Sequence, residues 1–164
     1  MIKWDEILNQ AYLGKRVHDL LTTLTDQLAL VYRANGITVP VPTSSTVQFL
    51  SENQDCSAAD IARSLDITHQ LATQRIEKLR KAGLVEKQLD QEDGRRVCWR
   101  LTADGKLQAH RLSSCMLNAI QVHESLFEET GINLLEAIDT IQAALAKQSL
   151  AQRFAALSAN EEAG

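Results

Sequence analysis

The chain has 164 residues, of which 45% are hydrophobic and 23% are charged, so it is long enough to bury a sizeable core. Two prolines, seven glycines and the lack of an apolar run of about eighteen residues exclude a collagen-like, low-complexity or membrane-spanning chain. The formal net charge is −4, but residues 60–100 carry nine Lys or Arg against seven acids, so the middle of the chain is mildly basic.

An amphipathic helix is predicted in the amino-terminal third, because apolar residues recur there at the three-and-four spacing of one helix face. The residues on this face are Val17, Leu20, Leu21, Leu24, Leu28 and Val31. Asn35 and Gly36 are expected to end the helix, so residues 1–36 form an amino-terminal helical region. Residues 37–43 are expected to be extended, because each of their two prolines disfavours helix in the preceding residue.

Two short helices should come next. The first begins at Thr43 or Ser44 and carries apolar residues at helical spacing. The second begins at Ser57, because Asp60 three residues later completes the pattern of a capping box. Asp66 and the residues after it break this second helix, so a tight turn is predicted there.

A longer helix is predicted over about residues 68–82. Thr68 has the side chain of a helix cap, and Gly83 stands where a left-handed residue would end the helix. The residues expected to pack inward are Ala72, Ile76 and Leu79, at positions i, i+4 and i+7. The opposite side of this helix is polar and basic.

A β-hairpin is predicted after this helix, because Val85–Leu89 and Val97–Leu101 alternate apolar and polar residues around a turn rich in Asp and Gly. A short helix, a turn, a longer helix and a hairpin make up the winged helix-turn-helix. We therefore predict a mainly α fold with a small β-hairpin wing, whose DNA-binding domain covers residues 37–105 and whose wing covers about 85–101.

The carboxy-terminal region, residues 106–164, is predicted to be helical and to serve dimerisation. A helix reopens at Thr102 with Gly105, and Thr130 with Gly131 marks its end. An apolar stripe follows at Leu134, Ile138, Ile141, Leu145, Leu150, Phe154 and Leu157. This stripe exceeds what a small winged helix could bury alone, which favours a two-fold homodimer over packing within one chain.

The outward side of the helix at 68–82 is predicted to enter the major groove of double-stranded DNA, which admits one helix. The residues expected to contact DNA are Thr68, His69, Gln70, Thr73, Gln74, Arg75 and Lys78. Gln70 and Gln74 lie one turn apart and carry the donor and acceptor pair that suits adenine. The alternative for the basic residues is a solvated helix surface on which Glu77 pairs with Lys81.

Five segments in this order resemble the MarR family of bacterial transcription regulators. Residues 57–65 (SAADIARSL) are similar to the first helix of the family's motif, and residues 67–79 (ITHQLATQRIEKL) to its recognition helix. Residues 83–87 (GLVEK) resemble the exit into the wing. The wing signature is matched by residues 90–96 (DQEDGRR) and then by residues 101–105 (LTADG).

The resemblance implies roles for three residues at the tip of the wing. Arg95 matches the arginine that family members place in or beside the minor groove, and Asp93 matches the residue that supports it. Arg96 is the neighbouring candidate. A narrow minor groove concentrates negative potential, which suits a guanidinium group at a hairpin tip. The alternative is a turn in which these arginines pair with the acids around them.

The resemblance also implies a dimer built from the first and last helices of both chains, which assigns residues 1–36 and 106–164 to dimerisation. It further implies a repressor that acts as this homodimer on a pseudo-palindromic operator and responds to a small aromatic or phenolic effector. Residues that could border an effector pocket are Trp4, Tyr12, His18, Met116 and His123, although each of them also suits a helix core or surface. Cysteine-based sensing through Cys56, Cys98 or Cys115 is an alternative that the sequence leaves open.

Other functional classes find less support. The four histidines are scattered, and neither a nucleophile motif nor a phosphate-binding glycine loop is present, so no enzyme, cofactor or metal site is predicted. A winged helix that contacts proteins instead of DNA shares the fold and stays an alternative. We expect a cytoplasmic protein without membrane contact, because residues 1–10 do not have the pattern of a secretory signal.

Overall fold

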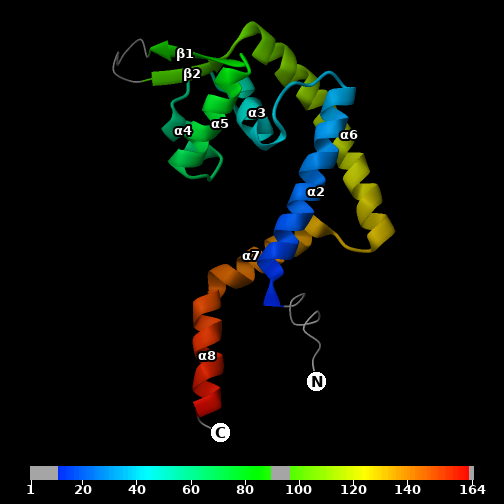
Figure 1. Cartoon of the computed structure of the whole chain (residues 1–164), viewed down its shortest axis with the longest axis vertical. Helices are drawn as coiled ribbons and strands as arrows, with labels where there is room; N and C mark the ends of the chain where they lie inside the picture. Colours follow the sequence, from blue (N-terminus) through cyan, green and yellow to red (C-terminus); the bar gives the residue numbers. More distant parts are fainter. Residues whose placement is uncertain (1–10, 90–96, 163–164) are drawn as a thin grey trace. The chain divides into compact units, whose positions relative to one another are not determined.

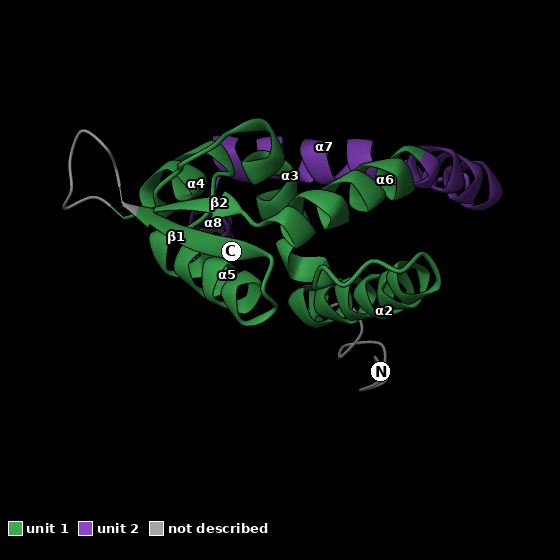
Figure 2. Cartoon of the chain, turned by 90° about the horizontal axis from the view of Figure 1, so that it is seen from above, with its two compact units in different colours: residues 1–117 green, residues 118–164 purple. Residues whose placement is uncertain are grey.

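The computed structural model describes residues 11–89 and 97–162 of the chain. These residues form two compact units, 1–117 and 118–164, which are coloured separately in Figure 2. Figure 1 shows the elements in chain order: α2 (Leu13–Ala34), the 3-10 turn η1 (Val41–Thr43), α3 (Ser44–Glu52), α4 (Ala58–Ser64), α5 (His69–Lys81), β1 (Val85–Leu89), β2 (Val97–Leu101), α6 (Ala103–Thr130), α7 (Leu134–Lys147) and α8 (Leu150–Glu162). The fold is mainly α with a two-stranded antiparallel hairpin.

The end of α2 confirms the predicted stop and shows how the helix is attached. Gly36 has a φ of 63°, a left-handed value that glycine adopts without strain. The Gly36 carbonyl accepts a hydrogen bond of 2.7 Å from Nη1 of Arg111 on α6. Two residues later, the backbone N–H of Thr38 donates to Oε1 of the buried Gln108, at 2.8 Å. Side chains of α6 therefore hold the chain where it leaves α2.

The segment after α2 differs from the prediction in its last part. An extended chain was predicted through residue 43, but Val41–Thr43 form a 3-10 turn, so this part of the prediction is wrong. Pro40 is extended, with φ −62° and ψ 126°. Pro42 lies in the first residues of the turn, where its missing N–H costs no helical hydrogen bond. Pro40 and Pro42 therefore mark the start of a helical turn.

The helix-turn-helix forms as its capping residues predict. The N–H of Asp60 donates to the Ser57 hydroxyl at 3.2 Å, and the N–H of Ser57 donates to the Asp60 carboxylate at 2.9 Å. Asp66 in the turn has a φ of 50°. The hydroxyl of Thr68 then accepts a bond of 3.2 Å from the N–H of Leu71 and starts α5. The predicted capping box, turn and longer helix are confirmed.

The wing is the predicted hairpin, with one additional backbone bridge that the sequence did not predict. β1 and β2 pair antiparallel, with Val85 opposite Leu101. Cys56, in the loop between α3 and α4, forms an isolated β-bridge with Trp99 on the outer side of β2. Its two backbone hydrogen bonds measure 3.2 and 2.8 Å. This bridge ties the base of the wing to the loop that precedes α4.

The start of α6 comes very close to the loop between α5 and β1. The hydroxyl of Thr102 donates to the Gly83 carbonyl at 2.8 Å and accepts from the N–H of Gly105 at 3.0 Å. The N–H of Thr102 donates to the Leu84 carbonyl at 3.0 Å. A Cβ atom at Gly105 would lie 2.0 Å from the same Leu84 oxygen. Only glycine fits at position 105.

The hydrophobic core lies entirely in the first unit. Its buried members all fall between residues 32 and 115: Tyr32, Ile37, Val39, Val47, Leu50, Ile61, Ala62, Ala72, Ile76, Leu79, Leu84, Val85, Leu101, Ala109, Leu112 and Cys115. In the second unit, no side chain described from residue 118 to residue 158 is buried.

The second unit has an unpredicted break between α7 and α8, where the hydroxyl of Ser149 accepts a hydrogen bond from the N–H of Gln152 at 3.3 Å.

We expect the substitution Gly105→Ala to lower the free energy of unfolding by about 2 kcal/mol or more, because the added methyl group meets a backbone oxygen and the chain has to shift. Urea denaturation of both proteins measures this difference. Gly14→Ala is the matched control, because nothing lies within 4 Å of a Cβ atom built there, and it should cost no stability. Equal stabilities of the Gly105 and Gly14 variants would contradict the close approach.

Candidate nucleic-acid interface

The orientation of α5 is set by its buried side. Ala72, Ile76 and Leu79 are 0%, 2% and 0% exposed, as the spacing predicted. In the first unit α5 contacts α3, α4, η1 and β1 (Figure 1). The opposite side is in solvent and includes most of the predicted contact residues: Thr68, His69, Gln70, Thr73, Gln74 and Lys78. Their contact with DNA stays a prediction, but the structure places them together on one exposed strip.

The side chains of the strip differ in whether they form hydrogen bonds within the chain. The Thr68 hydroxyl caps α5, and the Thr73 hydroxyl donates to the His69 carbonyl at 2.9 Å. Within the described residues, the side-chain amides of Gln70 and Gln74 have no hydrogen-bond partner. These two amides therefore keep both a donor and an acceptor available to a ligand.

Arg75 lies apart from the strip. Its Nη1 donates to the Ser45 hydroxyl on α3 at 3.2 Å, and the side chain is half-buried. Its Nε is buried and has no partner among the described residues. The helical spacing explains this position, since residue 75 is three residues after Ala72 and four before Leu79 and so faces the core side of α5. Its contact with DNA stays a prediction.

The last turn of α5 carries an ion pair that differs from the alternative considered for the sequence. Glu77 accepts two hydrogen bonds of 2.8 Å from Arg80, not from Lys81. The bond with Arg80 lowers the pKa of the Glu77 carboxyl and raises that of the Arg80 guanidinium. Lys78 and Lys81 remain exposed cations of the same turn. Both side chains of the pair are about half exposed, so the pair contributes little to stability.

The predicted wing contacts fall in a part of the chain that the structure does not describe. Asp93, Arg95 and Arg96 lie within residues 90–96, outside the described residues, and so does the alternative ion-paired turn. The strands on either side are described. Between them, Nε of Arg100 donates to the Glu86 carboxylate at 2.8 Å.

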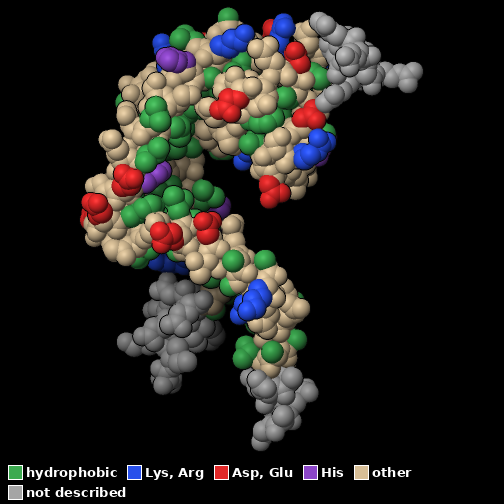
Figure 3. All heavy atoms as spheres, turned by 180° about the vertical axis from the view of Figure 1, so that it is seen from behind, with side chains coloured by type: hydrophobic (Ala, Val, Ile, Leu, Met, Phe, Trp, Pro, Cys, Tyr) green, Lys and Arg blue, Asp and Glu red, His purple; other side chains and the backbone are tan. Residues whose placement is uncertain are grey.

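Large apolar side chains are exposed along four helices, and hydrophobic side chains are visible at the surface in Figure 3. On α2 they include Val17, Leu20, Leu21 and Leu24. On α6 to α8 they include Leu117, Ile120, Val122, Leu135, Ile138, Ile141, Leu150, Phe154 and Leu157. None of the α7 side chains is buried. Most residues of the apolar stripes predicted from the sequence are therefore exposed in the single chain, whereas Leu28 packs against the core and Leu134 is partly buried.

The residues considered for an effector pocket differ in their surroundings within the part of the chain that the structure describes. Tyr12 and His18 are exposed, and His123 stacks on Phe127 with ring centroids 6.3 Å apart. Trp4 lies outside the described residues. No three His, Cys, Asp or Glu side chains in residues 11–89 and 97–162 are grouped to hold a metal ion. No helix of these residues is long and apolar enough to cross a lipid bilayer.

Comparisons with known proteins agree with this architecture. Residues 35–96 match the model of the MarR family. No curated protein sequence matches the chain. The chain is similar in structure to the heme sensor protein PefR from Streptococcus agalactiae in complex with heme, at 17% identity over 86% of this chain and 97% of that chain, with a TM-score of 0.59. It is also similar to the adhesin competence repressor AdcR from Streptococcus pyogenes, at 22% identity over 84% of this chain and 97% of that chain, with a TM-score of 0.54. At these identities the likeness shows a shared fold.

The position of Arg75 predicts a difference between two basic residues of α5. Arg75→Ala should lower the free energy of unfolding by about 1 kcal/mol, because the half-buried stem and the bond to Ser45 are lost. Lys78→Ala should change it by less than about 0.5 kcal/mol, since Lys78 is in solvent. Thermal and urea denaturation measure both effects. If the two variants were equally stable, Arg75 would not pack against α3.

Proposed function

We propose that this chain is a repressor that binds a pseudo-palindromic operator as a homodimer, because residues 35–96 match the model of the MarR family, whose members the sequence resembles. The observation that carries the proposal is the exposed polar strip of α5 opposite its buried apolar side. A helix with one side held in the core can offer only its other side to the major groove.

The strip has the side chains that base reading requires. Gln70 and Gln74 lie one turn apart, and each can form two hydrogen bonds with the edge of an adenine. His69 and Thr73 beside them can each donate or accept one bond. Lys78 is exposed farther along α5 and is suited to a phosphate of the backbone. Gln70 and Gln74 are proposed to select the sequence, while Lys78 adds affinity that depends on salt.

The wing is proposed to add a contact in the minor groove through Arg95 and Arg96, with Asp93 in support. This part of the proposal rests on the resemblance to the family. The described base of the wing favours it, because the bridge between Cys56 and Trp99 attaches β2 to the loop before α4. A hairpin attached in this way would move together with the helix-turn-helix that contains α5.

A second copy of the chain is proposed to cover the apolar side chains of α2, α6, α7 and α8. Monomeric proteins rarely leave large contiguous apolar surfaces in water, and here the described side chains of the second unit have no buried member. A two-fold dimer would place two α5 helices about one turn of DNA apart.

Repression that is relieved by a small molecule is the finer part of the proposal. Of the similar structures, one is described as a repressor and another as a heme sensor, which favours a regulator of this kind. A small aromatic or phenolic effector is proposed for this chain from the family resemblance. A repressor would block access of the polymerase to DNA until the effector releases it.

Selection of the purified protein against a random duplex library tests sequence-specific binding. We expect a two-fold symmetric site with half-sites about ten base pairs apart. Gln70→Ala and Gln74→Ala should then each weaken binding to that site by about 1 to 3 kcal/mol, with the loss confined to certain base pairs. Fluorescence anisotropy at two salt concentrations measures the affinities and separates base reading from phosphate contact.

Gln121→Ala, an exposed glutamine of α6, is the matched control and should bind as the unchanged protein does. Recovery of no preferred sequence would contradict the proposal and favour a winged helix that contacts proteins. Recovery of a site that both glutamine variants bind unchanged would show that another face of the domain reads the DNA.

Dimerisation is tested by placing a charge on the apolar stripe of α7. Ile141→Glu should weaken the dimer at least tenfold, because a carboxylate would have to lose its water in the interface. Ile141 is 53% exposed in the single chain, so the change should leave the fold of each chain intact. Gln142→Glu adds the same charge one residue along and is the control. Sedimentation equilibrium measures the association, and an equal effect of both changes would argue against this face as the interface.

A further inference from the structure

Leu71, in the first turn of α5, is an apolar side chain on an otherwise polar surface. It is 36% exposed, and it is the only exposed large hydrophobic side chain that the structure describes in residues 32–88 and 97–106. The other large hydrophobic residues of α5, Ile76 and Leu79, are buried. The winged helix-turn-helix therefore leaves one large hydrophobic side chain in water, and this side chain lies on the helix proposed to read DNA.

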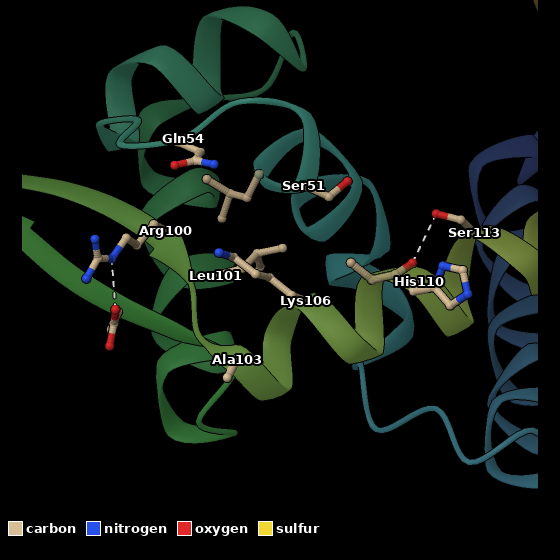
Figure 4. Close-up of a pocket in the computed structure, with 11 residues that line it drawn as sticks. Ser51, Gln54, Arg100, Leu101, Ala103, Lys106, His110 and Ser113 are labelled. Carbon is tan, nitrogen blue, oxygen red and sulfur yellow. Dashed lines mark hydrogen bonds and ion pairs between the residues drawn. The ribbon is translucent and has the colours of Figure 1, made fainter.

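No other apolar region of the first unit includes Leu71. It is not among the residues that form the core or pack against it. A groove of about 770 Å³ is bounded by the end of α3, the two wing strands and the start of α6 (Figure 4), but no residue of α5 lines it. The apolar side chains proposed for the dimer lie on α2, α6, α7 and α8. The exposure of Leu71 thus needs a separate explanation.

The helical spacing places Leu71 beside the glutamines of the exposed strip. Gln74 comes three residues after Leu71, and residues three apart on a helix have Cβ atoms about 5 to 6 Å apart. Arg75, four residues after Leu71, is bound to Ser45 on α3. Leu71 therefore lies at the edge of the strip, between Gln74 and Arg75. Its backbone N–H donates to the Thr68 cap at 3.2 Å, which holds this turn of the helix in place.

An aliphatic side chain in the major groove finds its match in the 5-methyl group of thymine. The major-groove edges of the other bases offer hydrogen-bond donors and acceptors. An aliphatic group would remove water from these polar atoms without replacing the lost hydrogen bonds. A leucine at the edge of a base-reading strip thus favours thymine.

We propose that Leu71 contacts the 5-methyl group of a thymine in the operator and so selects a T·A base pair. This inference rests on the proposed function and adds a base that the two glutamines do not select. One base-pair step is about 3.4 Å along the duplex. The spacing of Leu71 and Gln74 therefore places this thymine within about two base pairs of the adenine proposed for Gln74.

Deoxyuridine tests the contact directly, because it pairs as thymine does but lacks the 5-methyl group. Each thymine of the selected operator is replaced in turn, in both half-sites, and fluorescence anisotropy measures the affinity of the full chain. We expect one symmetric pair of positions at which deoxyuridine weakens binding at least about fourfold, the factor for one buried methyl group. This pair should lie within about two base pairs of the position affected by Gln74→Ala.

Variants of Leu71 show whether this side chain makes the contact. Leu71→Ala should weaken binding to the thymine operator by a similar factor and should bind the deoxyuridine operator equally well, because the two changes remove the same contact. Leu71→Met keeps an apolar side chain and should still prefer thymine. Leu107→Ala, at a leucine of α6 that is 50% exposed, is the matched control and should keep the full preference.

The inference is overturned if the operator contains no thymine, or if no deoxyuridine substitution weakens binding of the unchanged protein. It is also overturned if Leu71→Ala responds to every substitution as the unchanged protein does, or if Leu107→Ala loses the preference to the same extent. In each of these cases an operator is still bound, so the proposed function stands. Failure to select any operator would instead defeat the proposed function, and the role of Leu71 with it.

Discussion

The burial of one side of α5 is the constraint on which the rest of this structure depends. Ala72, Ile76 and Leu79 are held in the core, and a helix is rigid, so this burial determines which residues face solvent. Leu84 follows the helix and is fully buried, so it fixes the end of α5 in the same core. Its carbonyl accepts from the N–H of Thr102 and lies against Gly105, so the core that orients α5 also positions the start of α6.

A second set of contacts joins α5 to the amino-terminal helix. The Tyr32 hydroxyl on α2 lies 2.8 Å from the Ser44 hydroxyl, and the next residue, Ser45, accepts from Arg75. Burial raises the pKa of the Tyr32 phenol, so it stays a neutral partner in this contact. The first turn of α3 therefore lies between the helix proposed for dimerisation and the helix proposed to read DNA. A shift of α2 would be transmitted to α5 through Ser44 and Ser45.

The two units differ in how their apolar side chains are buried. The first unit has a closed core and its own network of capping and backbone bonds. The second unit consists of amphipathic helical segments whose apolar side chains are exposed in the single chain. Helices of this kind gain most of their stability from packing against a partner. DNA binding is thus proposed for a domain that has its own core, and assembly is proposed for helices that a second chain would cover.

Local patterns in the sequence determined most of the elements. Capping residues such as Ser57 and Thr68, and glycines such as Gly36 and Gly83, act on their own neighbours, so the sequence alone predicts where helices start and stop. The three-and-four spacing likewise determined the buried side of α5. Contacts between residues far apart in the chain were decided by the tertiary structure. The bridge from Cys56 to Trp99 joins separate segments, and so does the bond from Arg75 to Ser45. No local pattern in the sequence indicates which distant segment will lie beside another.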